Sequence, residues 1–120
     1  MAGISTNQVN YINAHGTATV NNDITEANAI CRLFEKKVPA LSSTKSYMGH
    51  TLGASGAVEA IISILSIKNG VAFPNLRFRE PIPELPLMPI TKVQQFPIEH
   101  VLTNSFGFGG NCSSLVFSKT

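Results

Sequence analysis

Two short segments each place a histidine beside a glycine, after a run of residues that favours a β-strand. The first is Asn-Ala-His-Gly-Thr at residues 13–17, and the second is Lys-Ser-Tyr-Met-Gly-His at residues 45–50. Two neutral imidazoles that converge on one point can donate hydrogen bonds to a carbonyl oxygen that becomes negative. We therefore predict that His15 and His50 form a site for an enolate or oxyanion. No obvious nucleophile accompanies them in the sequence.

A single acidic residue interrupts a helical segment that is otherwise apolar nearly all round. We expect this helix over residues 51–68, and its composition predicts a central, buried position. Glu59 lies within it, and a buried carboxylate is costly unless it is paired. Lys45 is the predicted partner, and the alternative is that Glu59 points to solvent through a gap. His50 would sit at the start of this helix, where the positive end of the helix dipole disfavours imidazolium.

A glycine-rich segment near the carboxyl end joins two predicted strands. Residues 106–111 read Phe-Gly-Phe-Gly-Gly-Asn, between strands expected over 102–105 and 114–117. A turn of this kind favours an antiparallel pair. Two aromatic rings among three glycines also suit a ring that swings while backbone N–H groups point into a cavity. A plain tight hairpin is the alternative interpretation.

The remaining elements are expected to position these segments. Strands are predicted over residues 9–14 and 38–41. Asn69-Gly70 should end the helix expected over residues 51–68. A one-faced covering helix is predicted over residues 23–35, capped by Asn22 or Asp23. Its apolar face would consist of Ala27, Ile30, Leu33 and Phe34. Six of the seven prolines fall in residues 74–97, which predicts an ordered irregular connection. The order β-α-β-α-loop-β-β implies a layered α/β sheet.

The composition limits the classes of function. The chain has 120 residues, 43% of them hydrophobic and 13% charged, against a charged fraction of about 25% in typical domains. We therefore expect one domain, part of whose surface meets another protein surface. The net charge of +2 comes without a Lys/Arg run, so no nucleic-acid partner is expected. No segment reaches the roughly 20 apolar residues of a membrane span, and no secretory signal is visible, so the expected location is cytoplasmic.

Two features concern cysteine and the start of the chain. Cys31 and Cys112 form no CxxC pair or Cys/His cluster, so neither a disulfide framework nor a zinc site is expected. Both thiols are predicted to be inert. Residues 2–4 read Ala-Gly-Ile, like the end of a helix rather than a beginning. We therefore expect the chain to be cut from a longer polypeptide.

Taken in order, the motifs resemble the C-terminal part of β-ketoacyl-acyl carrier protein synthases. The resemblance covers nearly the whole chain and is weakest over residues 73–96. The matching blocks are residues 13–17, Asn22-Asp23 with Glu26, 42–46, 49–50, 52–60 and 104–111. The resemblance implies a thiolase-like α-β-α fold and fatty acyl elongation by decarboxylative Claisen condensation, without an organic cofactor. It also implies acyl carrier protein, acyl and malonyl thioesters and the chain's own N-terminal half as partners, and a homodimer for the complete enzyme.

The resemblance further implies roles for the residues that lie nearest to the chemistry. His15 and His50 would bind the malonyl thioester carbonyl and stabilise the enolate. Lys45 would orient and tune the site through Glu59.

Two further groups of residues receive roles from the resemblance alone. Phe108 would be the gate between the malonyl side and the acyl pocket, with Phe106 beside it. The backbone N–H of Phe108 would help form the oxyanion hole, at the turn that also contains Gly109. A buried polar cluster, which in some members holds a monovalent cation, would consist of Asn13, Glu59 and Asn104 or Ser105.

The chain departs from the family pattern in one large respect. The nucleophilic cysteine of the family lies in the N-terminal half, and neither Cys31 nor Cys112 matches its motif. Nucleophilic catalysis needs a thiolate within reach of its activators. We therefore expect residues 1–120 to be the C-terminal domain of a longer synthase and to be inactive on their own.

Three other interpretations compete with this one. A non-catalytic partner, like the chain-length-determining subunits that lack the cysteine, would have no chemical need for His15, Lys45 and His50. A hydrolase could use Ser43 or Ser113 with a histidine, but the sequence has no Gly-x-Ser-x-Gly elbow. A degradative thiolase would use one histidine and a second cysteine where this chain has two histidines.

Overall fold

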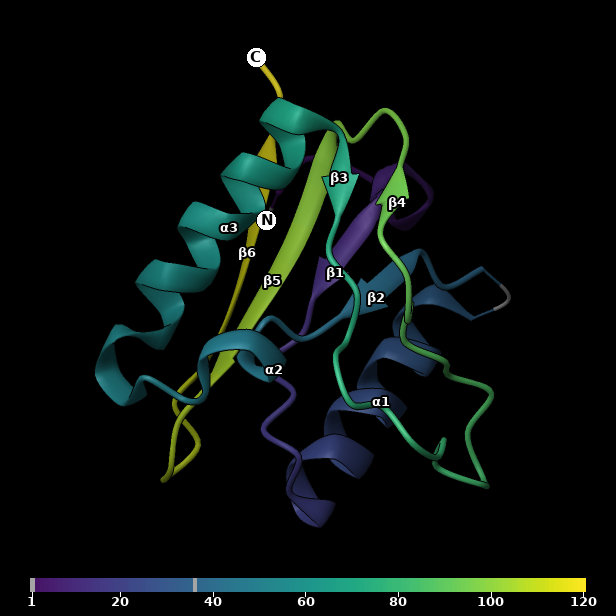
Figure 1. The fold of residues 1–120 in the computed structure, drawn as a ribbon, viewed down its shortest axis with the longest axis vertical. Coiled ribbons are helices and arrows are strands. Elements are labelled where there is room, and N and C mark those ends of the chain that lie inside the picture. Colours follow the sequence, from purple (N-terminus) through teal and green to yellow (C-terminus); the bar gives the residue numbers. More distant parts are fainter. Residues whose placement is uncertain (1, 36) are drawn as a thin grey trace.

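A four-stranded mixed sheet organises the protein. The computed structural model describes residues 2–35 and 37–120. The strand order is β2-β1-β5-β6, as Figure 1 shows. Strand β1 (Tyr11–Asn13) pairs in parallel with β2 (Ala40–Ser42) and β5 (His100–Phe106), and β5 pairs antiparallel with β6 (Cys112–Ser118). The predicted α/β sheet, with its antiparallel pair around the glycine-rich turn, is therefore confirmed.

One long helix covers each face of this sheet (Figure 1). They are α1 (Val20–Phe34) and α3 (Ser55–Asn69). Successive side chains of a strand point to opposite faces, so β1 contributes to two cores. Ile12 packs in one cluster with Ile30 of α1, and Tyr11 belongs to a second cluster against which Ile67 of α3 packs. The result is an α-β-α layering.

Short elements make up most of the rest. Two of them, η1 (Thr6–Gln8) and η2 (Leu52–Ala54), are single 3₁₀ turns, and α2 (Lys45–Met48) is one turn of helix. Strand β3 (Val71–Ala72) pairs antiparallel with β4 (Gln94–Gln95). Apart from β4, residues 74–97 form no helix or strand, which confirms the predicted irregular connection. Among the described residues, no helix has the length and apolar character needed to cross a membrane.

Helix α1 differs from its prediction at its start and along one edge. Its N-cap is Thr19, so the expectation that Asn22 or Asp23 caps the helix is wrong. Leu33 is 55% exposed, because it lies at the edge of the stripe that packs on the sheet. Glu26, which the pattern placed off the apolar face, is instead buried. Its carboxylate oxygens accept hydrogen bonds from backbone N–H groups in the interior of the protein.

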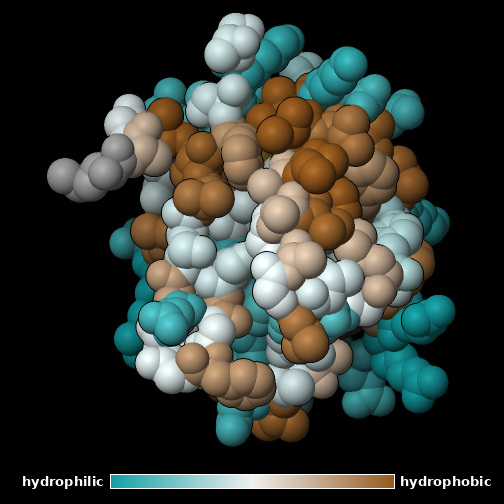
Figure 2. Space-filling model, turned by 90° about the vertical axis from the view of Figure 1, so that its left-hand side faces the viewer, coloured by the Kyte–Doolittle hydropathy of each residue, from teal (hydrophilic) through white to brown (hydrophobic). Residues whose placement is uncertain are grey.

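Helix α3 has an inverted pattern of burial. Its buried residues are polar, namely Ser55, Glu59, Ser63 and Ser66. Ile61, Ile64 and Leu65 are 58%, 49% and 43% exposed, and we call these three residues the α3 outer face. Figure 2 shows hydrophobic residues gathered on the side of the molecule that carries α3. The prediction of a helix buried nearly all round is therefore wrong for the described chain, because the sheet covers its polar side.

The end of α3 agrees with the sequence. Asn69 is its last residue, and Gly70 follows with a φ of 62° in the left-handed region, where glycine is favoured. The Gly70 N–H donates to the Ser66 carbonyl. The predicted Asn-Gly stop is confirmed.

Candidate active site

The structure brings the two histidines together. His15 follows β1 and His50 follows α2, yet their ring centroids lie 5.3 Å apart with 87° between the ring planes. His15 is 4% exposed, whereas His50 is exposed. The two imidazoles therefore meet edge to face at the surface of a partly enclosed site.

The surroundings of His15 fix which ring nitrogen carries its proton. Nζ of Lys45 lies 3.2 Å from Nδ1 of His15. An ammonium group only donates hydrogen bonds, so Nδ1 accepts and the proton of the neutral ring lies on Nε2. Burial, the charge of Lys45 and the charge of His50 together lower the pKa of His15 to about 4. His15 is therefore a neutral Nε2–H donor near pH 7.

His50 reaches the same tautomer by a different route. The backbone N–H of Leu52 donates to its Nδ1 over 3.0 Å, so the proton of the neutral ring again lies on Nε2. Helix α3 begins only at Ser55, which makes the expectation that His50 stands at the helix start wrong. A local hydrogen bond to Nδ1, rather than the end of a helix, therefore determines the tautomer of the His50 ring.

A buried ion pair joins Lys45 to Glu59. Lys45 is 8% exposed and Glu59 is 1% exposed, so the predicted partner of Glu59 is confirmed and the solvent-gap alternative is wrong. Burial raises the pKa of Glu59, and the hydrogen bond from Lys45 opposes this. Lys45 thus contacts both His15 and Glu59.

The predicted polar cluster divides between the two faces of β5. Ser105 Oγ donates to Glu59 Oε2 over 3.4 Å, and the Asn13 side chain donates to the Glu59 carbonyl over 3.4 Å. Asn104 points the other way, because neighbouring residues of a strand face opposite sides, and it donates to Glu26 Oε1 over 3.0 Å. The expectation that Asn104 could join Glu59 is therefore wrong, and Ser105 takes that place.

These contacts also test whether the residues could form the monovalent cation site that the family resemblance implies. The Asn13 side-chain oxygen accepts the N–H and the hydroxyl of Thr44 at 3.3 and 3.2 Å, and Lys45 takes one oxygen of Glu59. The polar atoms are thus already partnered, and Asn104 lies on the opposite face. The residues do not fit a monovalent cation site. Across residues 2–35 and 37–120, no three His, Cys, Asp or Glu side chains cluster as metal ligands.

Glu26 is a residue of the site that sequence reasoning missed. Its two carboxylate oxygens accept the backbone N–H groups of His15 and Gly16, each at 2.9 Å. The third donor is Asn104. Glu26 therefore clamps the loop that carries the first histidine. The signal was an acidic residue directly before Ala27 on the predicted apolar stripe.

The loop that carries His15 is also in direct contact with the segment between β2 and α2. Ser43 Oγ donates to the carbonyl oxygen of Gly16 over 3.0 Å. Gly16 has a φ of 42°, and a Cβ atom on it would lie 2.5 Å from Cβ of Ser43, so only glycine fits. Ser43 Oγ also lies 3.3 Å from the backbone carbonyl oxygen of His15. Within the described part of the chain, neither Ser43 nor Ser113 hydrogen-bonds to the ring of a histidine, which disfavours the serine hydrolase.

The two aromatic residues of the glycine-rich turn lie in different surroundings. The Phe106 ring centroid is 5.4 Å from that of His15. Phe108 is fully exposed, and Gly109 follows it with a φ of 84°. The structure places Phe106 at the site and leaves Phe108 free of contact with the histidines. The gate role of Phe108 stays a prediction.

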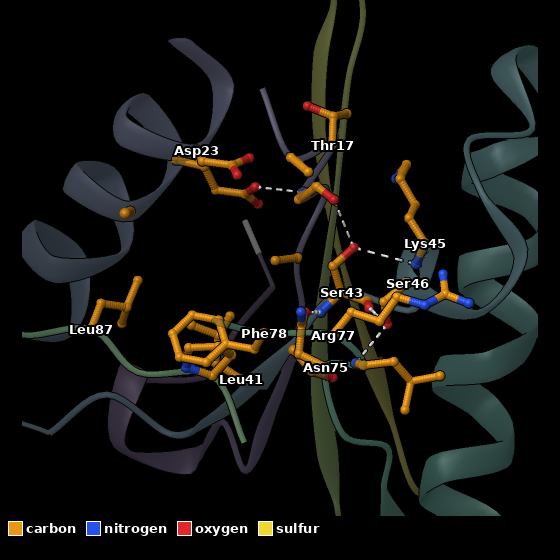
Figure 3. A pocket seen from close by; sticks show the side chains of 18 of the residues that line it. Thr17, Asp23, Leu41, Ser43, Lys45, Ser46, Asn75, Arg77, Phe78 and Leu87 are labelled. Atoms are coloured by element: carbon orange, nitrogen blue, oxygen red, sulfur yellow. Dashed lines mark hydrogen bonds between the residues drawn. The ribbon is translucent and has the colours of Figure 1, made fainter. Parts of the chain in front are cut away.

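A hollow of about 820 Å³ adjoins these groups, and both Lys45 and His50 line it. Figure 3 shows Lys45 and Arg77 at one end and Leu41, Phe78 and Leu87 toward the other. The site is therefore open to a ligand that has polar and apolar parts. Arg77, in the proline-rich segment where the sequence was least informative, was not predicted to be there.

Comparison with known proteins agrees with this geometry. The family described as "Beta-ketoacyl synthase, C-terminal domain" matches residues 1–79. The chain is 44% identical to a mitochondrial 3-oxoacyl-[acyl-carrier-protein] synthase of Arabidopsis thaliana and 43% identical to 3-oxoacyl-[acyl-carrier-protein] synthase 2 of Coxiella burnetii. Each comparison covers 98% of this chain, but only 27% and 29% of the respective relative. The chain thus spans less than a third of their length.

Solved structures give the same result for the fold. A β-ketoacyl synthase from Burkholderia phymatum matches with a TM-score of 0.91 and 39% identity, over 98% of this chain and 29% of that one. The ishigamide ketosynthase/chain length factor matches with a TM-score of 0.94 and 33% identity, over 98% and 30%. The expected thiolase-like α-β-α fold is confirmed. On the family match and these likenesses, the chain belongs to the β-ketoacyl synthase C-terminal domain family.

Proposed function

We propose that residues 1–120 act as the C-terminal domain of a condensing enzyme that extends fatty acyl chains. The convergence of two imidazoles, each with its proton on Nε2, is the observation that carries this proposal. Two Nε2–H donors on neighbouring rings suit the oxygen of a thioester that becomes an enolate. A subunit that only determined chain length would have no use for such a pair, which favours the condensing enzyme.

We propose the following reaction at these two donors. Nε2–H of His15 and of His50 donate to the carbonyl oxygen of a malonyl thioester. The bond between the carboxylate and the α-carbon breaks, carbon dioxide leaves, and its electron pair forms the enolate. The enolate carbon then attacks the carbonyl of an acyl thioester on a cysteine, and the cysteine thiolate leaves. Lys45 keeps Nδ1 of His15 as the acceptor throughout.

The cysteine would come from the part of the polypeptide that the relatives possess and this chain does not span. The α3 outer face, defined above as Ile61, Ile64 and Leu65, supports a contact of this kind, because it leaves apolar surface in water. We propose that the missing portion covers this face. A cytoplasmic location and a homodimer of the complete enzyme belong to the same proposal.

The carrier of the thioesters is proposed to be acyl carrier protein. A type II polyketide ketosynthase that matches with a TM-score of 0.92 and 35% identity is described in complex with its acyl-carrier protein. The names of the curated relatives contain the same carrier. We propose that this domain meets the carrier when both halves of the enzyme are present.

Release of carbon dioxide from radiolabelled malonyl-acyl carrier protein tests the proposal. The 120-residue chain alone should give no release or condensation above background. A polypeptide that joins it to a cysteine-bearing N-terminal half should release carbon dioxide, and His15→Ala or His50→Ala should abolish this. Full decarboxylation in both variants, or turnover by the chain alone, would refute the roles assigned here.

A further inference from the structure

The segment between His50 and α3 forms a closed set of hydrogen bonds around Nδ1 of His50. Besides the Leu52 N–H, Ser55 Oγ lies 3.1 Å from this nitrogen. The same oxygen lies 3.2 Å from the Thr51 backbone nitrogen and 3.2 Å from Thr51 Oγ1. Ser55 is 5% exposed, so protein groups rather than solvent must satisfy its hydroxyl.

The capacity of a hydroxyl group decides where the Ser55 proton goes. Each hydroxyl has one proton to donate and two lone pairs to accept with. The Thr51 N–H takes one lone pair of Ser55 Oγ, and the Thr51 hydroxyl donates to the other. The proton of Ser55 is then directed at Nδ1 of His50, a stronger acceptor than a hydroxyl oxygen, where it shares the single lone pair with the Leu52 N–H. Every donor and acceptor of Ser55 is satisfied in this arrangement.

We propose that Ser55 is a positioning residue for His50. Its hydroxyl and the Leu52 N–H together keep Nδ1 as an acceptor, so that the ring proton stays on Nε2. Leu52 has a φ of 51°, which is uncommon for a residue with a branched side chain, and this conformation delivers its N–H to the ring. The benefit for catalysis rests on the proposed function, in which that Nε2–H binds the thioester oxygen.

The proposal implies that the two histidines are fixed by different means. An ammonium group, Lys45, holds Nδ1 of His15, whereas neutral donors hold Nδ1 of His50. A charge on Lys45 and a hydroxyl on Ser55 thus serve the same end. Their loss should affect different rings.

Nuclear magnetic resonance of the histidine rings tests this in the 120-residue chain, which has three histidines. Two-bond proton–nitrogen correlations distinguish a proton on Nδ1 from one on Nε2. In the unsubstituted chain, the neutral ring of His50 should carry its proton on Nε2. Ser55→Ala should shift its Nδ1 resonance toward that of a free ring and give rise to some Nδ1–H form. Ser55→Thr, which keeps the hydroxyl, should restore the original pattern.

Ser66→Ala is the matched control. It removes an equally buried hydroxyl from the same helix, and Ser66 Oγ has no hydrogen-bond partner among the described residues, so His50 should not change. A His50 spectrum that Ser55→Ala leaves unaltered overturns the proposal. So does a proton on Nδ1 in the unsubstituted chain, a result that requires no variant to fold. Because no thioester is used, a failed decarboxylation assay would count against the proposed function alone.

Discussion

Nζ of Lys45 lies 3.2 Å from Nδ1 of His15 while the same ammonium pairs with the buried carboxylate of Glu59. One cation therefore serves two partners, one neutral and one charged. The pair keeps a charge in the interior where it can hold an imidazole in one tautomer. Lys45 is for this reason expected to contribute both to stability and to the proposed chemistry.

Removal of that cation should be destabilising. Lys45→Met leaves the Glu59 carboxylate buried without its counter-charge, and we expect a loss of about 3 kcal/mol in the free energy of unfolding. Urea denaturation measures it. The double variant Lys45→Met, Glu59→Gln should recover much of the loss, and Lys68→Met, at an exposed lysine on α3, should change little. A loss below about 1 kcal/mol for Lys45→Met would mean that the ion pair is solvated.

Stability should fall on acidification because of His15. Its pKa is lowered from 6.5 to about 4 in the folded protein, so the unfolded state binds more protons between these values. The free energy of unfolding should therefore rise with pH across this window, by on the order of 3 kcal/mol in total. The same stability is lost as the pH falls from 6.5 to about 4. Urea denaturation at a series of pH values measures this.

His15→Gln isolates the effect of that one ring. Glu59, whose pKa is raised, gives a slope of the opposite sign above its ordinary value, but it is present in both proteins and cancels in the difference. Over this window, the slope of the free energy of unfolding against pH should therefore correspond to the uptake of about one more proton on unfolding in the unsubstituted protein than in His15→Gln. Equal slopes of the free energy of unfolding against pH in the two proteins would show that His15 has the same pKa in the folded and the unfolded state.

The meeting of the two histidines was predictable because of strand order. Each follows a strand of the parallel β1–β2 pair, and the carboxyl ends of parallel neighbours lie at the same edge of a sheet. The pairing of Glu59 with Lys45 was predictable for another reason, since a charge in an apolar helix demands a partner.

Other features depend on contacts that periodicity does not contain. The pattern of α3 indicates apolar residues on most sides, but it does not say which side meets the sheet and which awaits another surface. Glu26 was missed because two of its three donors are backbone N–H groups, which no residue type in the sequence identifies. Asn104 and Ser105 are adjacent, and only the register of β5 decides which of them faces Glu59.

The contact between Gly16 and the segment that joins β2 to α2 predicts a strong effect at Gly16. Gly16→Ala adds a Cβ atom at 2.5 Å from Cβ of Ser43, at a φ of 42°, so both the clash and the left-handed backbone oppose it. We expect a loss of about 2–3 kcal/mol in the free energy of unfolding. Gly53→Ala is the control, because a Cβ there meets nothing within 4 Å. Equal urea midpoints for the two variants would contradict the close approach of Gly16 to Ser43.

Glu26→Gln should disturb the first histidine without touching its ring. The carboxylate accepts two backbone N–H groups and an amide N–H, and an amide would place a donor against one of them. We expect a loss of about 2 kcal/mol in stability and a changed amide resonance for His15. Glu99→Gln, at an exposed glutamate, is the control. An unchanged His15 amide in Glu26→Gln would argue against the clamp.

Two neighbouring residues of α3 test its inverted burial. Ser63 is fully buried and donates to the Glu59 carbonyl over 2.7 Å, whereas Ile64 is 49% exposed. Ser63→Leu should lower the free energy of unfolding of the 120-residue chain by about 2 kcal/mol or more, because there is no room against the sheet. Ile64→Lys should change it by less than about 0.5 kcal/mol, because the lysine lies in water. Urea denaturation of both variants measures the contrast, and the opposite order would show that the apolar side faces the sheet. In a polypeptide that includes the cysteine-bearing half, Ile64→Lys should become strongly destabilising, since a charge would then be buried between the two halves.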